Sequence, residues 1–272
     1  MPNTVFHTGQ HIMSLIKKRP DYSNKGTFGT LVSLCGTRNM TGAAYLSSMA
    51  ALRSGVGLLK LAADEYTQMV LKNSLFEVVF IKPEEILDQD GAAYLVGCGL
   101  GRENDTLLKE LLPSFEKKTV IDADGINYLS ANINVLKNMR CEKILTPHPG
   151  EMSRLIGKDV AYVEYDRVGV ASSFAVENNC ILVLKGKNTV IALLDGSVVI
   201  NTTGNSGLAK GGSGDVLAGL IASLCAQGYS CADAAVLGVY LHGAAADILI
   251  PRYGEHGMLP RDLPEQIGVL LG

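Results

Sequence analysis

The chain has 272 residues, of which 47% are hydrophobic, so it is long enough for one large α/β domain with a sizeable core. A net charge of −3 gives no broad basic surface, and aromatic residues make up only 6% of the chain, without tryptophan. Charge and composition therefore argue against a nucleic acid or an anionic membrane as partner, and any phosphate group must be held locally.

Cysteine usage and the N-terminal region bear on location. The six cysteines form no C-x-x-C pair and mostly adjoin apolar runs, which indicates free, buried thiols in a reducing compartment. The first twenty residues contain no apolar segment with a cleavage site, and no apolar run approaches the length of a membrane span. We therefore expect a soluble, cytoplasmic protein with no membrane partner, and a single domain over residues 1–272, because no linker divides the chain.

Strand-like and helix-like segments alternate along the chain. A short amphipathic helix is expected first, over Thr8–Lys18, with Thr8 as its cap. Strands are expected at Thr30–Cys35, Gly57–Ala62, Glu77–Phe80, Ala93–Gly97, Thr119–Asp122, Lys143–Leu145, Ile181–Leu184, Thr189–Leu194 and Ser197–Ile200, the last two as a hairpin. Helices are expected at Gly42–Ser54, Glu65–Asn73, Asp105–Glu116, Asp215–Gln227 and Ala232–Leu249. This alternation predicts a mostly parallel sheet covered on both faces, with ligands at the carboxyl ends of its strands.

A polar, glycine-dense loop runs into an apolar-faced helix within Asn201–Gln227. Its glycines allow positive φ angles and a close approach of the backbone to a ligand; they are Gly204, Gly207, Gly211, Gly212 and Gly214. The first N–H groups of the helix that follows carry partial positive charge and point back at the loop. We therefore expect a phosphate group to bind at this junction.

Asp215 stands at the junction and has two compatible interpretations. It is either an N-cap of the helix, a position for which aspartate is well suited, or a general base held beside a bound phosphoryl group. The pattern around it is neither a dinucleotide-binding G-x-G-x-x-G motif nor a P-loop, because no Lys-Ser/Thr pair follows the last glycine.

Two aspartates follow the strand at Thr119–Asp122. Asp122 and Asp124 either cap a helix that begins near Gly125 or, at a phosphate site, hold Mg²⁺ directly or through water. Asn127 is a further candidate for such a site. Sequence alone leaves both interpretations open.

Four other positions combine polar or glycine residues with strand ends or apolar segments. Gly97–Gly101 is either a tight strand-to-helix turn or a ligand contact. His148 lies in a loop between two prolines, where a fixed histidine is typical of a functional position, and no Cys/His cluster predicts zinc. Lys185 and Lys187 at a strand exit are typical of a solvated turn. His242 lies in an apolar segment and is interpreted as a satisfied core histidine, outside the site.

Taken together, these motifs resemble those of the ribokinase-like superfamily, whose G-x-G-D anion-hole signature is matched by Gly212–Asp215. Within it, the chain resembles the ADP-dependent NAD(P)H-hydrate dehydratases. The shared blocks follow the family's order and span nearly the whole chain; they are Lys25–Gly29, Gly42–Ala44, Ala50–Gly55, Thr146–Glu151, Lys185–Thr189 and Gly204–Asp215. The resemblance implies an α/β fold of the ribokinase-like three-layer α/β/α type, with a mostly parallel central sheet and without the β-lid of some sugar kinases.

The resemblance also implies which residues bind which ligand. The catalytic residue is Asp215. The substrates NADHX and NADPHX are expected at Ala43, Ala44, Gly101, Asp124, His148 and Asp215. ADP and its product AMP are expected at Lys185, Gly186, Lys187, Asn188, Thr189, Asn205, Gly212, Ser213 and Gly214. Mg²⁺ is the implied metal, and Glu151 either supports the site from behind or is a Mg²⁺-linked carboxylate.

The activity implied by the resemblance is repair of nicotinamide cofactors that carry a hydroxyl group at C6 of the reduced ring. We expect Asp215 to take the proton of that hydroxyl, which attacks the terminal phosphoryl group of ADP. Elimination of phosphate then yields NAD(P)H and AMP. The preference for ADP over ATP, the acceptance of both hydrates and a homotetrameric state are likewise implied only by the resemblance.

Two other functions remain open at this point. A small-molecule kinase of the same superfamily, such as a vitamin kinase, would use the same Asp215 and anion hole on a stable alcohol. A nucleotide sensor without enzymatic activity would bind ADP and not turn it over, although the intact Asp215 beside an intact glycine loop disfavours that function.

Overall fold

The computed structural model describes residues 4–5 and 9–272 and confirms the predicted α/β architecture. One sheet of ten strands has the order β1-β10-β9-β8-β7-β6-β5-β2-β3-β4. The strands are β1 Thr4–Val5, β2 Thr30–Leu34, β3 Leu58–Ala62, β4 Val78–Ile81, β5 Ala93–Val96, β6 Lys118–Ile121, β7 Lys143–Leu145, β8 Ile181–Leu184, β9 Val190–Ala192 and β10 Val198–Ile200. Neighbouring strands are parallel except at β8–β9 and at the predicted hairpin β9–β10.

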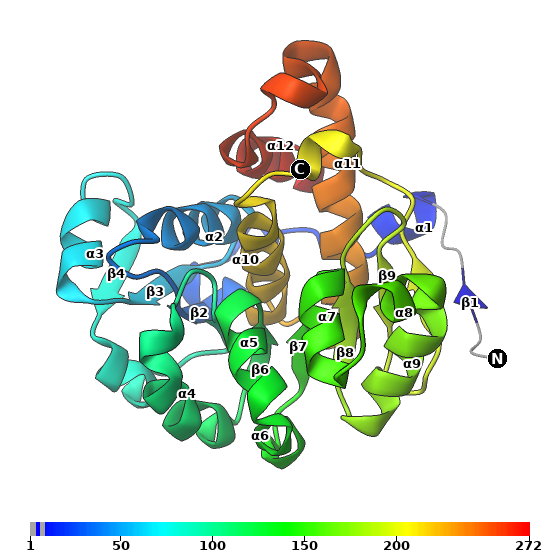
Figure 1. Cartoon of the computed structure of the whole chain (residues 1–272). Helices are drawn as coiled ribbons and strands as arrows, with labels where there is room; N and C mark the ends of the chain where they lie inside the picture. The colour runs from blue at the N-terminus through cyan, green and yellow to red at the C-terminus, as the bar shows by residue number, and fades with distance from the viewer. Residues whose placement is uncertain (1–3, 6–8) are drawn as a thin grey trace.

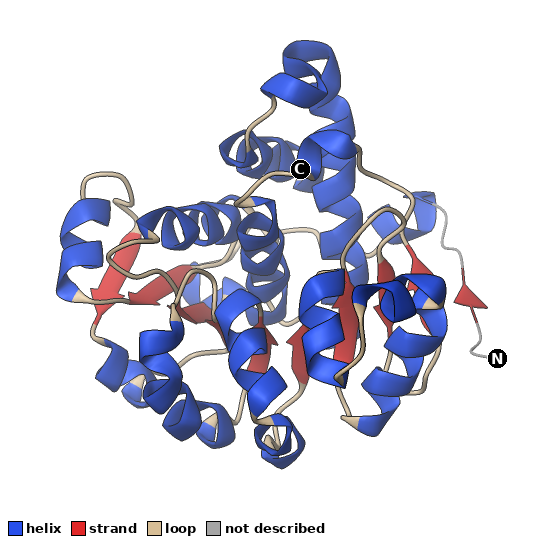
Figure 2. Cartoon of the chain, viewed as in Figure 1, coloured by secondary structure: helices blue, strands red, loops and turns tan. Residues whose placement is uncertain are grey.

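Helices cover both faces of this sheet, as the red band of strands between blue helices shows in Figure 2. One face carries α1 Gly9–Met13, α2 Thr41–Arg53, α3 Glu65–Leu71, α10 Ser213–Ala226, α11 Cys231–Gly257 and α12 Leu263–Leu271. The other face carries α4 Asp105–Leu111, α5 Ala123–Ala131, α6 Ile133–Asn138, α7 Pro149–Ile156, α8 Val160–Tyr165 and α9 Arg167–Glu177. The arrangement is the predicted three-layer α/β/α fold.

Strand alternation divides the core between these two layers. In β2, Leu31 packs in the layer that contains α10, whereas Val32 and Leu34 pack in the layer that contains α5, because successive side chains of a strand point to opposite faces. All three side chains are at most 1% exposed. Strands buried on both faces explain why the sequence shows continuous apolar runs at these positions.

The strand order reverses between β5 and β2, which positions the site. The chain continues from β2 to β3 on one side and from β5 to β6 on the other, so the connections that follow β2 and β5 diverge toward opposite halves of the sheet. Ligands of such sheets bind at the carboxyl ends of the strands, in the crevice that this divergence opens. Gly36 after β2 donates its N–H to the carbonyl of Cys98 after β5, at 2.7 Å.

Several predicted boundaries were wrong. The first helix covers only Gly9–Met13, because Lys17 donates from its backbone N–H to the Tyr229 hydroxyl and leaves the helical path; its predicted cap Thr8 lies outside the described residues. Helix α4 ends at Leu111, where Pro113 allows only a short 3-10 turn. Helices α6, α7, α8, α9 and α12 were not predicted.

Helix α11 is the only helix in the described part of the chain that is long and apolar enough to cross a membrane. It has 27 residues, and 67% of its most apolar 18-residue stretch is buried within the protein. In Figure 1 it packs beside α10 as part of one helical layer. Buried core helices of α/β domains can be equally long and apolar, so the length and composition of α11 are weak support for a membrane span.

Candidate active site

Helix α10 begins at Ser213, two residues earlier than predicted. Gly212 is its N-cap and has a φ of 102°, and a side chain there would come within 2.5 Å of Leu46. Asp215 therefore lies in the first turn of the helix, and its interpretation as the N-cap was wrong. The helix opens on the glycine loop without a capping side chain, so its first N–H groups are suited to an anion.

Asp215 faces two buried groups from neighbouring strand ends. One carboxylate oxygen each of Asp215 and Asp122 and the sulfur of Cys98 all lie within 4.8 Å of one another. The Cys98 thiol donates to Asp122 Oδ2 at 3.8 Å. Burial and the charge of Asp122 raise the pKa of Asp215 to about 6, while the Cys98 thiol and Lys185 act in the opposite direction. A carboxylate with this pKa can accept a proton near neutral pH.

Lys185 supplies the positive charge at this site. Its Nζ donates to Asp122 Oδ1 at 2.8 Å and lies 3.9 Å from Glu151 Oε2. The Thr146 hydroxyl donates to the same Asp122 oxygen at 2.7 Å. Burial acts to lower the pKa of Lys185, but the two carboxylates outweigh it and raise the pKa.

The ammonium group of Lys185 also lies beside the first turn of α10. A Cβ atom placed on Gly214 would be 3.3 Å from Lys185 Nζ. The side chain is only 19% exposed, so the interpretation of Lys185 as part of a solvated turn was wrong. Lys187, two residues later, is exposed as that interpretation expected.

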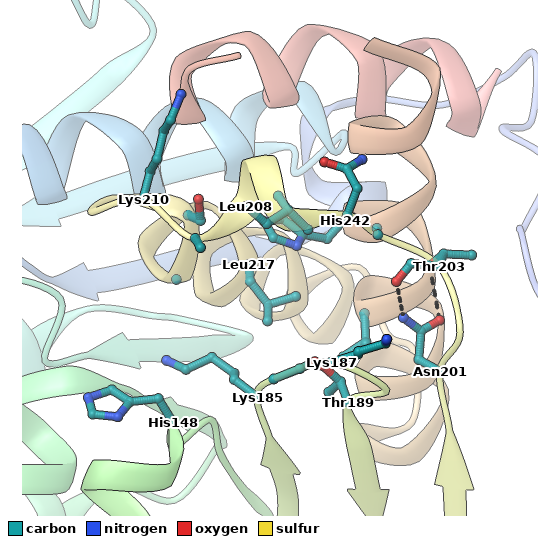
Figure 3. A pocket seen from close by; sticks show the side chains of 18 of the residues that line it. His148, Lys185, Lys187, Thr189, Asn201, Thr203, Leu208, Lys210, Leu217 and His242 are labelled. Atoms are coloured by element: carbon teal, nitrogen blue, oxygen red, sulfur yellow. Dashed lines mark hydrogen bonds between the residues drawn. The ribbon is translucent and has the colours of Figure 1, made fainter. Parts of the chain in front are cut away.

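His148 ends a loop and forms the N-cap of α7. Its Nδ1 accepts from the Gly150 N–H at 3.0 Å, while Glu151 Oε2 accepts from the His148 N–H at 2.8 Å. Burial and the charge of Lys185 lower the pKa of His148, so its imidazole is neutral near pH 7. Burial raises the pKa of Glu151. The His148 side chain is 51% exposed, and Figure 3 shows it beside Lys185 at the edge of the pocket.

Asp124 accepts a hydrogen bond from the glycine loop after β5. Its Oδ2 accepts from the Gly101 N–H at 2.8 Å, and its Oδ1 accepts from the Asn127 side chain at 3.2 Å. Arg154 donates to Asn127 Oδ1 at 2.9 Å. Asp124 is therefore tied to the loop and to α7, and it does not cap α5, since the N-cap of that helix is Asp122 without a capping side-chain bond.

The alanines predicted at the substrate lie next to the same loop. Ala43 packs against Gly99, where an added Cβ would be 2.6 Å from the Ala43 Cβ. Ala44 packs in the same way under Gly36 and is completely buried. Because Cys98 contacts Asp215, this loop meets the start of α10 at the candidate base.

The loop before α10 is fastened to α11 at the opposite end of the site. The carboxylate of Asp247 accepts from the Gly204 N–H at 2.8 Å and from the Asn205 amide at 2.9 Å. Lys210 donates to the carbonyl of His256 at 2.6 Å. These contacts are exposed, in contrast to those around Asp122.

A cavity of about 940 Å³ lies between these two ends (Figure 3), a volume typical of small-molecule sites. Its lining contains every predicted nucleotide-binding residue, namely Lys185, Gly186, Lys187, Asn188, Thr189, Asn205, Gly212, Ser213 and Gly214. It also contains Asp122, His148 and Asp215. The other predicted residues lie outside the lining; they are Ala43, Ala44, Gly101, Asp124 and Glu151.

Sequence reasoning missed Cys98, Asp247 and His242. His242 is buried as expected, but it lines the cavity and its Nε2 has no hydrogen-bond partner among the described residues, so its interpretation as a satisfied core histidine was wrong. A histidine in a helix otherwise rich in alanine and glycine was the available signal. Cys98 stood inside a marked glycine block, whereas nothing in the sequence pointed to Asp247.

Comparisons with known proteins agree with this geometry. The sequence model of the NAD(P)H-hydrate dehydratase family matches residues 31–268. A protein of Neisseria meningitidis serogroup B named ADP-dependent (S)-NAD(P)H-hydrate dehydratase is 39% identical over 258 residues, which cover 90% of this chain and 85% of that protein. A Moorella thermoacetica protein named bifunctional NAD(P)H-hydrate repair enzyme is 39% identical over 267 residues, 92% of this chain and 50% of that protein. The chain thus spans about half the length of such bifunctional relatives.

Solved structures show the same fold. The ADP/ATP-dependent NAD(P)H-hydrate dehydratase of Bacillus subtilis, co-crystallized with ATP/Mg²⁺, superposes with a TM-score of 0.88 at 30% identity, over 97% of this chain and 96% of that one. Hydroxyethylthiazole kinase from Pyrococcus horikoshii superposes with a TM-score of 0.67 at 15% identity, over 96% and 91%. The second similarity concerns the fold alone.

Proposed function

The chain belongs to the NAD(P)H-hydrate dehydratase family, and on this premise we propose that it dehydrates the S form of NADHX and NADPHX with ADP as co-substrate. The products are NADH or NADPH, AMP and phosphate, so the enzyme is a carbon–oxygen lyase that repairs hydrated nicotinamide cofactors. ADP is the proposed phosphoryl donor because relatives from Neisseria meningitidis and Bacillus subtilis are named for it, although the solved Bacillus structure is described as that of an ADP/ATP-dependent enzyme.

The observation that carries this proposal is the position of Asp215. It lines the nucleotide-sized cavity and at the same time contacts Cys98 in the loop after β5, so it lies where a nucleotide and a second substrate would meet. Its raised pKa, about 6, keeps it largely deprotonated at neutral pH and still basic enough to accept a proton. Asp215 takes the proton of the C6 hydroxyl, and that oxygen attacks the terminal phosphorus of ADP.

The anion hole lowers the barrier to this transfer. Negative charge develops on the phosphoryl oxygens as AMP leaves, and the N–H groups at the start of α10 and the ammonium group of Lys185 lie beside that position. One well-placed donor of this kind contributes roughly 3 to 4 kcal/mol. The C6–O bond then breaks and phosphate leaves with its electron pair, while the neighbouring C5 loses a proton to the departing phosphate, which restores the C5=C6 double bond of the reduced ring.

We place the hydrated nicotinamide ring on the side of Asp215 toward Gly101, Asp124 and His148. The Gly101 loop is fixed by Asp124, and His148 is neutral and half-exposed beside Lys185. A neutral imidazole can donate or accept a hydrogen bond to the carboxamide or a hydroxyl group of the substrate. Ala43 and Ala44 shape the backbone beneath this loop and do not offer polar groups from their side chains.

Mg²⁺ is proposed to enter with the nucleotide. The carboxylates of Asp122, Asp124 and Glu151 already accept from Lys185, the Gly101 N–H and the His148 N–H, so they do not form an open cage of oxygen ligands. Glu151 therefore fits a supporting role better than that of a direct ligand. Mg²⁺ commonly keeps several waters and is held through substrate phosphates, where it neutralises charge.

A vitamin-type kinase is the alternative, supported by the fold it shares with hydroxyethylthiazole kinase. The same base and anion hole would then phosphorylate a stable alcohol, and the phosphorylated product would accumulate. Family membership and the coverage of the Neisseria relative favour the dehydratase.

Absorbance at 340 nm separates these functions. The purified protein is mixed with NADHX, Mg²⁺ and either ADP or ATP, and a rise in absorbance with formation of AMP is expected when ADP is the donor. No rise with either nucleotide overturns the dehydratase proposal, and a screen of alcohol acceptors for stable phosphoesters then tests the kinase.

Location and assembly are part of the same proposal. All six cysteines, each within the described part of the chain, are free and buried, which suits a reducing cytoplasm. We place the enzyme there as a homotetramer, by resemblance to its family. Light scattering of the purified protein is expected to give the mass of four chains, and a monomeric or dimeric mass contradicts the assembly.

A further inference from the structure

Two polar side chains at the cavity wall each have one buried polar atom without a partner among the described residues. His242 on α11 is 7% exposed and Ser213 at the start of α10 is 6% exposed. Neither His242 Nε2 nor Ser213 Oγ has a hydrogen-bond partner in residues 4–5 and 9–272. Both residues line the cavity, and such unpaired buried groups are rare in proteins because each loses its hydration without compensation.

The fold brings these two residues together. The imidazole of His242 lies against the backbone of Ser213, and Figure 3 shows it beside Leu208 and Leu217 at the wall of the pocket. Helix α11 approaches this wall closely through Gly243, where a side chain would press on Thr203 at 2.3 Å. Burial lowers the pKa of His242 to about 4, so the ring is neutral and one of its nitrogens is an acceptor.

We propose that His242 is a positioning residue of the anion hole, which accepts a hydrogen bond from the Ser213 hydroxyl when a nucleoside diphosphate occupies the glycine loop. The inference rests on the proposed function, since it concerns the same nucleotide. A neutral acceptor and an unused hydroxyl donor are complementary; Ser213 is the first residue of α10, and His242 of α11 lies against its backbone. Pairing them fixes the first turn of α10, which raises affinity for the β-phosphate in particular.

Binding of ADP and AMP by calorimetry tests this inference. His242→Leu keeps the volume of the side chain and removes both nitrogens, and it is expected to weaken ADP binding about tenfold and AMP binding less than about twofold. His242→Gln restores an acceptor in the side chain and recovers most of the ADP affinity. An equal loss for AMP and ADP overturns the inference, because the histidine would then contact the base or the ribose.

A double-mutant cycle with Ser213→Ala decides whether His242 acts through that residue. If the two side chains pair, Ser213→Ala weakens ADP binding in the wild-type protein and has little further effect in His242→Leu; additive losses overturn the inference. Should His242→Leu fail to fold, the cycle is run with His242→Phe.

A packing control and the wild-type protein complete the experiment. Val236→Ala, on α11 and outside the cavity lining, removes buried volume and is expected to lower Tm without changing the ratio of ADP to AMP affinity. Wild-type protein that binds no ADP contradicts the proposed function itself, whereas wild-type binding with unchanged variants contradicts only the role of His242.

Discussion

The two ends of the cavity are built in different ways. The catalytic cluster, defined as Cys98, Asp122, Glu151, Lys185 and Asp215, comes from strand ends and helix starts, and its ion pair joins an Asp122 side chain that is 2% exposed to a Lys185 side chain that is 19% exposed. The nucleotide loop, residues 201–210, is held to α11 by exposed contacts of Asp247 and Lys210. Buried charge networks are costly to disrupt, while exposed ones contribute little. Under the proposed function, this difference suits chemistry at the first end and adjustable ligand binding at the second.

Asp215→Asn tests the catalytic cluster most severely. The amide keeps the shape of the side chain but cannot take the hydroxyl proton, so we expect kcat to fall by about 10²- to 10⁴-fold. ADP affinity measured by calorimetry should stay within about threefold, because the N–H groups of α10 are unchanged. Near-normal turnover of this variant would refute the assignment of the base.

A matched control for this variant lies outside the site. Asp195 is exposed in the turn between β9 and β10 and does not line the cavity. Asp195→Asn makes the same chemical change and should leave both kcat and the ADP dissociation constant unaltered.

Lys185→Met is expected to have the next largest effect. It removes the charge beside the anion hole and leaves Asp122 and Glu151 buried without their common cation. We expect kcat to fall by about 10²-fold and the free energy of unfolding to fall by about 3 kcal/mol. Denaturant titration and steady-state kinetics measure the two losses. Lys187→Met, on the same loop but exposed, should leave stability unchanged; equal destabilisation by both variants would contradict the distinction between the two ends.

The pH dependence of kcat/KM should identify the cluster as well. The folded-state pKa of Asp215 is raised to about 6, so the base is protonated and inactive below that pH and active above it. We expect kcat/KM to fall about tenfold per pH unit below pH 6. Lys185 lowers the pKa of Asp215, so replacing Lys185 should move the acidic fall in kcat/KM to higher pH. A profile that is flat from pH 7 to pH 5 excludes Asp215 as the titrating base.

The raised pKa of Asp215 also makes the free energy of unfolding depend on pH. Since the pKa of Asp215 is higher in the folded than in the unfolded chain, the folded state binds more protons between about pH 4 and pH 6, and this group disfavours folding progressively as pH rises through that range. Asp215→Asn removes this cost, and we expect its free energy of unfolding at pH 7 to rise by about 3 kcal/mol. Thermal denaturation at pH 7 and pH 4 checks the sign: the gain over wild type should shrink at pH 4, and a variant less stable than wild type at pH 7 contradicts it.

The sequence predicted the features that depend on local patterns and missed those that depend on contacts between distant residues. The periodicity of apolar runs predicted all strands from β2 to β10 and the helices α2, α3, α4, α10 and α11, because each of these elements buries a regular pattern. Glycine spacing predicted the loop that leads into α10, whose first turn has no capping side chain. The sequence could not show that Lys185 pairs with Asp122, because the two residues are 63 positions apart and meet only through the order of the strands. The interpretation of His242 was wrong for a related reason. Its apolar neighbours in the sequence indicated that it is buried, but its unpaired nitrogen depends on how α10 and α11 pack.

The smallest effect is expected at the exposed end of the cavity. Asp247→Ala releases the Gly204 N–H and the Asn205 amide, yet both can bond to water, so the free energy of unfolding should fall by less than about 1 kcal/mol. The loop then pays more conformational entropy to close over a nucleotide, and we expect KM for ADP to rise about three- to fivefold with kcat unchanged. Asp247→Asn, which can still accept the Gly204 N–H, should recover part of that loss. A large fall in kcat for Asp247→Ala would mean that the exposed loop orders the first turn of α10, and the two ends of the cavity would then act as one unit.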